Sequence, residues 1–431
     1  MSAANGARTA TALGGIRVVE ISNELGAFAG KLLADMGADV ISIEPPGGSP
    51  MRGYEPFRDD VPDTEGSLHW WHYNTSKRGI TLDLETDSGR DCFRRLIDTA
   101  DLLLECEPPG RLKELGLDHA TLAAEHPELI TVSITPFGQQ GAGRSDLATD
   151  LTLLAEGGPV WSCGYDDHSL PPVRGGGNQG YQTACHYAVM SALTAILIRE
   201  GTGLGQHVDV NAHAACNVTT EMSSYHWLVS KGTVKRQTGR HAMEFSTLPT
   251  QIECADGRHA TTGVPPRTPA EFATLHEWLV ELGLTDEFPE SIFIRMGAER
   301  EQIDLSQIGS DDELTAIFGA AREALNFIAS RVSAYAFFEG AQKRGITVGV
   351  IYSPEEAMED AHFRARGFPV EVEHKTLGAT FTYPGAPYVF EKTPWRISRP
   401  APQLGEHNQE IFGELGLSAK EIDVLCATGV R

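Results

Sequence analysis

The first 200 residues or so alternate between short apolar runs and amphipathic stretches. Residues 15–21 form a β-branched run bounded by glycine, which predicts a buried strand. Residues 27–36 place their apolar side chains on one helical face, and residues 39–44 predict the next strand. Because a helix that connects two such strands favours parallel pairing, this unit predicts a parallel sheet.

The same alternation continues along the chain. Further strands are predicted over residues 79–84, 101–106, 128–134 and 207–211, and a long, mostly apolar helix over residues 182–199. From about residue 225 the sequence becomes more polar and predicts short strands and amphipathic helices. We therefore expect an α/β fold with a large domain followed by a smaller one.

The composition is that of a globular protein long enough for two domains, with 431 residues, 41% hydrophobic and 22% charged. The net charge of −24 disfavours nucleic acid and anionic membranes as partners, and an anionic ligand would need a local basic pocket. Seven scattered cysteines without a CxxC pair are typical of reduced thiols, so we expect a cytoplasmic protein. We also expect no metal site, no export leader and no membrane span.

A glycine-rich stretch precedes the long helix. Residues 175–180 match the pattern G-x-G-x-x-G, but prolines just before them disfavour a dinucleotide site. Glycines expose backbone amides, so the stretch favours close approach to some ligand, and a plain turn is the alternative. Tyr181 follows directly. Its phenol, with a pKa of about 10, is a poor acyl acceptor but a good hydrogen-bond donor; packing at the helix start is the alternative.

Charged residues supply the other candidates. Lys77 and Arg78 lie beside a glycine before a predicted strand and would suit an anion, although a solvated turn is an equal alternative. Asp146 and Asp150 lie four residues apart and would share a helical face, as acid–base or covalent groups would. We favour a simpler role for Asp150, as the cap of a helix that begins at Leu151.

Five segments together resemble class III coenzyme A transferases, the family of formyl-CoA and carnitine-CoA transferases: residues 15–20, 32–48, 74–84, 202–210 and 404–408. The resemblance implies a Rossmann-like large domain with a parallel sheet, a smaller α+β domain, and two chains interlocked as a dimer. Residues 1–224 would begin the large domain, 225–330 would form the small one, and 331–431 would return to complete the large one. The ligand would be an acyl-coenzyme A, with a carboxylic acid as second substrate.

The resemblance also assigns site residues. It carries cofactor contacts over to Gly26, Arg52, Lys77, Arg78, Arg111 and Gly180. Glu85 and Glu114 stand where formyl-CoA transferase has cations. Most importantly, the acyl-accepting aspartate of the family corresponds to Tyr181, and tyrosine cannot form the carboxyl thioester that the exchange requires. Two-base racemisation, as in α-methylacyl-CoA racemases, is also disfavoured, because the two base positions are Thr149 and Tyr181.

Three interpretations remain open. The chain is a CoA-transferase subunit that works with a paralogous chain carrying the aspartate, or a transferase whose nucleophile has moved. For a moved nucleophile, Asp150 is the leading candidate, with Asp146 and Asp166 behind it. The third interpretation is an atypical acyl-CoA isomerase or lyase, or a non-catalytic acyl-CoA-binding subunit. A homodimer and a heterodimer are both compatible with the sequence.

Overall fold

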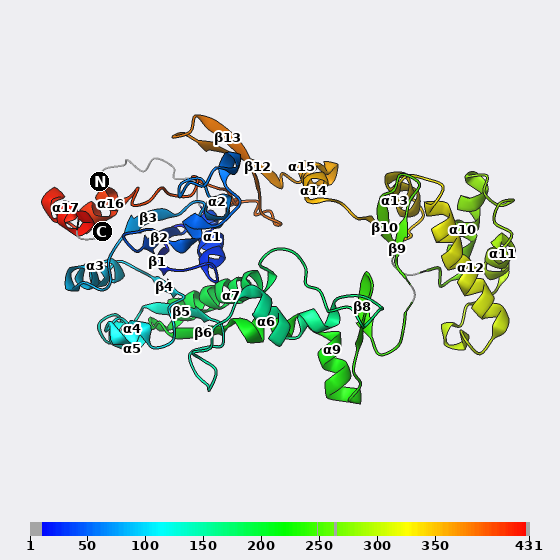
Figure 1. Ribbon diagram of the computed structural model, residues 1–431, viewed down its shortest axis with the longest axis horizontal. Helices are drawn as coiled ribbons and strands as arrows, with labels where there is room; N and C mark the ends of the chain where they lie inside the picture. Colours follow the sequence, from blue (N-terminus) through cyan, green and yellow to red (C-terminus); the bar gives the residue numbers. More distant parts are fainter. Residues whose placement is uncertain (1–10, 248, 263–264, 428–431) are drawn as a thin grey trace. The chain divides into compact units, whose positions relative to one another are not determined.

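The computed structural model describes residues 11–247, 249–262 and 265–427 (Figure 1). Its central sheet has six strands in the order β3-β2-β1-β4-β5-β6. The strands are β1 (Arg17–Ile21), β2 (Asp39–Glu44), β3 (Arg78–Thr81), β4 (Leu102–Glu105), β5 (Ile130–Thr135) and β6 (His207–Asn211). Each neighbouring pair is parallel, which confirms the predicted α/β class and parallel sheet.

Helices cover both faces of this sheet. Because alternate strand residues point to opposite sides, neighbouring residues of β1 lie in two different cores. Val18 lies in a core formed with four helices: α1 (Ala27–Asp35), α6 (Asp150–Glu156), α7 (Gln179–Thr202) and α8 (Ala212–Val218). Val19 lies in a second core, whose helices are α3 (Asp87–Ile97), α4 (Arg111–Glu114), α5 (His119–Glu125), α16 (Asn408–Glu414) and α17 (Ala419–Ala427). Both valines are fully buried, so the sheet is enclosed on its two faces.

The long helix α7 packs closely because its buried face is made of small residues. Ala184, Ala188, Ala192 and Ala195 are three or four positions apart and almost completely buried. The helix begins at Gln179, three residues before the predicted start, so Tyr181 belongs to its first turn.

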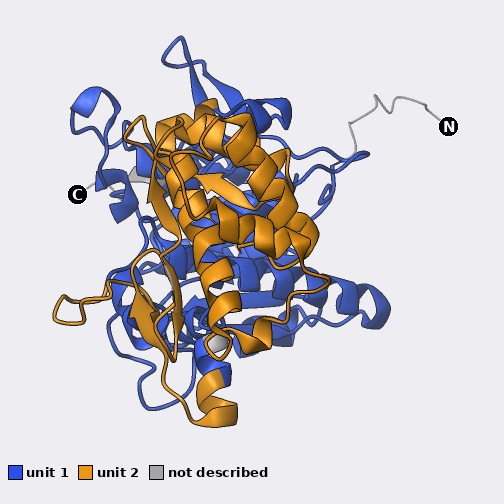
Figure 2. Ribbon diagram, turned by 90° about the vertical axis from the view of Figure 1, so that its right-hand side faces the viewer, with its two compact units in different colours: residues 1–161, 173–225, 360–431 blue, residues 162–172, 226–359 orange. Residues whose placement is uncertain are grey.

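The chain folds into two compact units (Figure 2). Unit 1 comprises residues 1–161, 173–225 and 360–431, and unit 2 comprises residues 162–172 and 226–359. The domain prediction placed the return to the large domain at residue 331, whereas unit 2 extends to Glu359. The difference has a packing cause, because Ala334, Phe337 and Ala341 are fully buried in the core of unit 2.

Unit 2 combines a small antiparallel sheet with a group of helices. The sheet contains β9 (Gln251–Glu253), β10 (His259–Thr262) and β11 (Val348–Val350), and the hairpin of β7 (Lys235–Gln237) and β8 (Arg240–Met243) is separate. The helices include α10 (Pro269–Glu281), α11 (Ser291–Glu299), α12 (Asp312–Ala329), α13 (Ala334–Gln342) and α14 (Pro354–Glu359). Trp278 stacks on Phe337 with ring centroids 5.5 Å apart.

The last part of unit 1 packs onto the N-terminal part through aromatic residues. After α15 (Ala361–Ala365), β12 (Pro369–His374) and β13 (Ala379–Pro384) form an antiparallel hairpin. Trp71 of α2 (Leu68–Tyr73) contacts His374 and Phe381, at centroid distances of 4.3 and 5.2 Å. Among the helices of the described residues, none is long and apolar enough to cross a bilayer.

Candidate active site

The order of the strands reverses between β1 and β4, and a cavity of about 370 Å³ opens at their carboxyl ends. Its walls come from the loops that follow β1, β4 and β5, from residues 49–54, and from the first turn of α7. A reversal point of this kind is where sheets covered on both faces bind ligands, outside the carboxyl ends of the strands. We therefore take this cavity, the switch-point pocket, as the candidate active site.

Tyr181 enters the switch-point pocket from the third position of α7. Its side chain is buried, and its hydroxyl lies 3.5 Å from Oε1 of Glu24. Burial raises the pKa of the phenol well above its usual value, and the charges on Glu24 and Asp150 raise it further. Tyr181 is therefore a neutral phenol near neutral pH, able to donate or accept a hydrogen bond but not to act as an anionic nucleophile.

Glu24 is the pocket residue that the sequence analysis missed. It follows β1 in the loop of residues 22–26 and is partly buried. Tyr54 lines the same pocket, and its pKa is raised by burial, by the charge on Glu24 and by a hydrogen bond to Glu24. One carboxylate thus faces two phenols. The available signal was an acidic residue in the loop after the first strand, at the edge where parallel sheets place their sites.

Asp150 lies beside the switch-point pocket but is not among the described residues that line it. Its Oδ1 accepts a hydrogen bond from the backbone N–H of Tyr181 at 3.0 Å, and its Oδ2 pairs with Arg174 at 3.2 Å. Asp150 therefore caps the N-terminus of α7, whereas Thr149 caps α6, the helix that contains Asp150. The sequence predicted that Asp150 would cap the helix that begins at Leu151, so Asp150 is a cap, but of α7. A nucleophilic role for Asp150 stays a prediction.

The two glycines assigned to the cofactor allow close packing beside the pocket. A Cβ atom on Gly180 would lie 3.0 Å from Sγ of Cys216 and 3.1 Å from Oδ1 of Asp150. A Cβ atom on Gly26 would lie 2.1 Å from Sγ of Cys106, so the Cys106 side chain would have to move. Both glycines therefore lie in close packing, whatever ligand the pocket holds.

Lys77 and Arg78 are held in internal ion pairs. Lys77 is fully buried, and its ammonium donates to Glu20, to the carbonyl of Ala27 and to Asn74, each at 2.9 Å. Since an ammonium has three N–H groups, all of its donors are used. Arg78 pairs with Asp39 at 2.6 Å, and also with Glu410 and Glu414 of α16.

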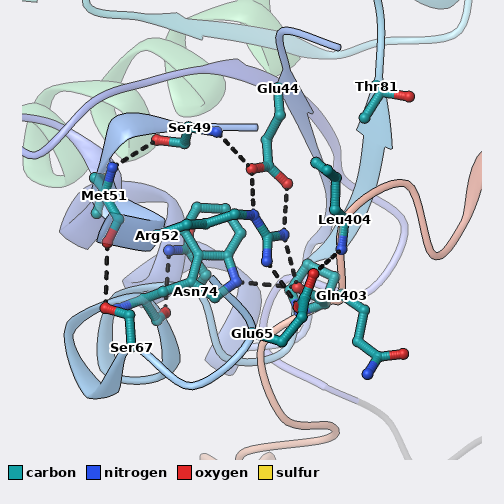
Figure 3. Close-up of polar contacts among 12 residues, drawn as sticks. Glu44, Ser49, Met51, Arg52, Glu65, Ser67, Asn74, Thr81, Gln403 and Leu404 are labelled. Carbon is teal, nitrogen blue, oxygen red and sulfur yellow. Dashed lines mark hydrogen bonds and ion pairs between the residues drawn. The ribbon is translucent and has the colours of Figure 1, made fainter. Parts of the chain in front are cut away.

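Arg52 is likewise enclosed (Figure 3). Its guanidinium pairs in a bidentate manner with Glu44, at 2.6 and 2.7 Å, and a further N–H donates to Glu65 at 2.9 Å. It lies 4.0 Å from the ring centre of Trp70. In this conformation, the charges of Arg52, Lys77 and Arg78 are already paired within the protein, and the phosphate-binding role implied by the resemblance stays a prediction.

The surroundings of the switch-point pocket are acidic. Glu24, Glu107 and Asp146 line it, against a single cationic lining residue within the described chain, Arg144. Nearby, Arg111 is neutralised by ion pairs with Glu85 and Glu114. Burial raises the pKa of Glu107, and Glu85 adds to the shift although Arg111 opposes it. An anionic ligand therefore meets a negative local potential here.

The remaining acidic candidate lies elsewhere. Asp166 belongs to unit 2, where it pairs with Arg240 at 2.7 Å. Across the described residues, no group of three or more His, Cys, Asp or Glu side chains is placed to hold a metal ion.

Glu105, at the end of β4 beside the pocket, gives a pH prediction. Burial raises its pKa to about 7, and the charges on Glu107 and Asp209 add to the shift. Because the folded pKa lies above the unfolded value, the stabilising contribution of the protonated acid is complete below pH of about 4.5 and is lost as pH rises through about 7. Glu105→Gln should flatten this fall, by a few kcal/mol at most.

Urea denaturation from pH 4.5 to 8 measures the effect. The wild-type free energy of unfolding should fall relative to Glu105→Gln across this range, whereas the exposed control Glu290→Gln should follow the wild type. Parallel curves for Glu105→Gln and the wild type would contradict the assignment.

Comparison with known proteins relates nearly the whole chain to one family. Residues 13–408 match the model of CoA-transferase family III. The chain is 34% identical over 413 residues to the subunit BbsE of succinyl-CoA:(R)-benzylsuccinate CoA-transferase from Thauera aromatica, covering 96% of each chain. It is 30% identical to a succinyl-CoA–D-citramalate CoA-transferase from Chloroflexus aurantiacus, covering 96% of this chain and 97% of the relative.

The fold has a close counterpart among solved structures. A CaiB/BaiF family protein from Brucella suis superimposes with a TM-score of 0.74 at 24% identity, covering 94% of this chain and 99% of that one. This likeness, at low identity, is one of fold.

Proposed function

Since the chain belongs to CoA-transferase family III, we propose that it is the subunit of a CoA-transferase that lacks the acyl-accepting carboxylate and works with a paralogous chain carrying one. The activity class itself, transfer of coenzyme A between carboxylic acids, follows from the family and from relatives that cover nearly the whole chain. The proposal concerns how the substrate-binding and acyl-accepting groups are divided between two chains.

The neutral phenol of Tyr181 is the observation that carries the proposal. In covalent CoA transfer, a carboxylate attacks the thioester carbonyl, the C–S bond breaks, and the CoA thiolate leaves. The product is a mixed anhydride between the acyl group and the carboxyl group of the enzyme. The thiolate then attacks the carbonyl that belongs to the enzyme's carboxyl group, which releases the first acid and leaves CoA on the enzyme as a thioester. A phenol cannot carry CoA as a thioester, and burial keeps Tyr181 protonated as well.

Two further observations support a partner chain. The relative from Thauera aromatica is itself named as a subunit. In addition, the acidic lining of the switch-point pocket disfavours the phosphates of coenzyme A, which suits a chain that leaves part of the substrate binding to its partner.

The test is to purify the chain from its native host and, in parallel, with a paralogue that has aspartate at the position of Tyr181. CoA exchange is measured over a panel of acyl-CoA thioesters of mono- and dicarboxylic acids. We expect a second polypeptide to co-purify, and exchange to require both chains. Exchange by this chain alone, at the rate of the mixture, would overturn the proposal.

A second possibility, a moved nucleophile, is favoured by one observation. Glu24 lines the pocket and faces the Tyr181 hydroxyl, which makes it better placed than Asp150. Trapping the chain with acyl-CoA and hydroxylamine or borohydride, followed by mass spectrometry, separates the two cases. Modification of Glu24 or Asp150 in the isolated chain supports a moved nucleophile; modification confined to the paralogue supports the subunit proposal.

A further inference from the structure

A second cavity, of about 880 Å³, lies at the opposite edge of the same sheet. It is lined by the turn before β1, by the first residues of β1, β2 and β3, by the return segment at residues 396–399, and by α16. The switch-point pocket lies at the carboxyl ends of the strands, whereas this cavity, the amino-edge cleft, lies at their amino ends. Their lining residues do not overlap.

The amino-edge cleft collects cationic side chains in a strongly acidic protein. Four arginines line it, against three carboxylates: Arg17, Arg78, Arg396 and Arg399, and Asp39, Glu410 and Glu414. The switch-point pocket has the reverse balance, with three carboxylates and one arginine. Of these two cavities, the amino-edge cleft is therefore the better place for an anion.

The three carboxylates of the cleft are all engaged by the same two arginines. Asp39 pairs with both Arg17 and Arg78, at 2.9 and 2.6 Å. Glu414 also bridges these two, at 3.0 and 2.6 Å, and Glu410 pairs with Arg78 at 2.8 Å. Arg17 and Arg78 are thereby held in a network of ion pairs at the base of the cleft, in which three carboxylates face two guanidinium groups.

Arg396 and Arg399 have no such partner. Within the described residues, neither guanidinium forms an ion pair, and both side chains belong to exposed residues that line the cleft. Two arginines three positions apart, both without a carboxylate, provide several N–H donors for an incoming anion. Guanidinium groups favour phosphate because they can bind two of its oxygens at once.

Arg399 has one further polar contact, in which its Nη1 lies 3.0 Å from Nε2 of His407. The backbone N–H of Gly79 donates to Nδ1 of the same ring at 3.1 Å. Burial lowers the pKa of His407, and the charge on Arg399 lowers it further. His407 supplies no negative charge, so this contact leaves the charge of Arg399 uncompensated.

We propose that the amino-edge cleft binds a small phosphate-bearing anion, held chiefly by Arg396 and Arg399. The diphosphate of a free nucleotide and that of coenzyme A share the required chemistry. The site is independent of the proposed division of labour between subunits, because none of its residues lines the switch-point pocket.

Titration calorimetry of the full chain with pyrophosphate at low ionic strength tests the proposal. We expect saturable binding, with a dissociation constant that rises at least about tenfold in the double variant Arg396→Ala/Arg399→Ala. Arg366→Ala is the matched control, since Arg366 is an exposed arginine of unit 1 outside the cleft, and it should leave binding unchanged.

ADP and coenzyme A, each competed against pyrophosphate, identify the source of the phosphate. Competition by ADP points to a free nucleotide, and competition by coenzyme A without ADP points to the coenzyme. Absence of saturable binding, or equal binding by the wild type and the double variant, would overturn the site. Thermal denaturation of each variant without ligand confirms that it is folded, so that loss of binding is not loss of structure.

Discussion

If the chain is a subunit without its own acyl-accepting carboxylate, Tyr181→Asp is expected to give the isolated chain CoA-transferase activity. The substitution places a carboxylate at the third position of α7, where the N-terminal end of the helix favours negative charge. A carboxylate there can attack a thioester and then carry coenzyme A. We expect exchange at least about tenfold above the wild-type chain, equivalent to about 1.4 kcal/mol of activation free energy.

Two neighbouring acids should limit this gain. Asp150 already accepts from the backbone N–H of residue 181, and Glu24 lies against the hydroxyl that is removed. Like charges this close disfavour ionisation of a new aspartate. Adding Glu24→Gln to Tyr181→Asp should therefore raise the rate further.

The matched control is Tyr181→Asn, which leaves the same space in the pocket but supplies no nucleophile. Exchange measured with single acyl-CoA thioesters, and mass spectrometry of the trapped intermediate on residue 181, provide the readout. Equal activity of the Asp and Asn variants would show that space, rather than a missing carboxylate, limits this chain.

The sheet could be predicted from the sequence because its signal is local. Val18 and Val19 lie in an apolar run whose alternate side chains enter opposite cores, and a run buried on both faces is typical of a parallel strand. The glycine-rich start of α7 and its long apolar face are local features too.

The roles of individual charges could not be predicted, because their partners are distant in sequence. The sequence predicted either an anion contact or a solvated turn for Lys77, and its carboxylate partner, Glu20, is 57 positions away. The sequence favoured Asp150 as the cap of the helix that begins at Leu151. In the structure it caps α7, which begins beyond a long loop. Glu24 lies outside the periodic segments that predict helices and strands. Its place in the pocket depends on the topology, which brings Tyr54 and Tyr181 close to it.

The buried pair of Lys77 and Glu20 gives the largest expected effect on stability. Both side chains are fully buried, with the ammonium 2.9 Å from the carboxylate. Lys77→Met keeps most of the unbranched side chain but leaves the Glu20 charge without its ammonium partner inside the protein. Breaking a buried ion pair in this way costs about 3–5 kcal/mol, so we expect the free energy of unfolding of unit 1 to fall by that amount.

The double variant Glu20→Gln/Lys77→Met separates charge from packing. Because no uncompensated charge remains, it should recover a large part of the loss, as buried pairs often can be replaced at little cost. Lys113→Met, at an exposed position of α4, is the control and should change the free energy of unfolding by less than about 0.5 kcal/mol.

Urea denaturation monitored by tryptophan fluorescence gives these values, since Trp70 and Trp71 report on unit 1. If Lys77→Met instead unfolds like the wild type, the ammonium is dispensable for the fold. Lys77 would then be available to move toward a ligand, and this result would support the phosphate-binding role implied by the family resemblance. The stability of this one variant therefore decides between a structural and a ligand-binding lysine.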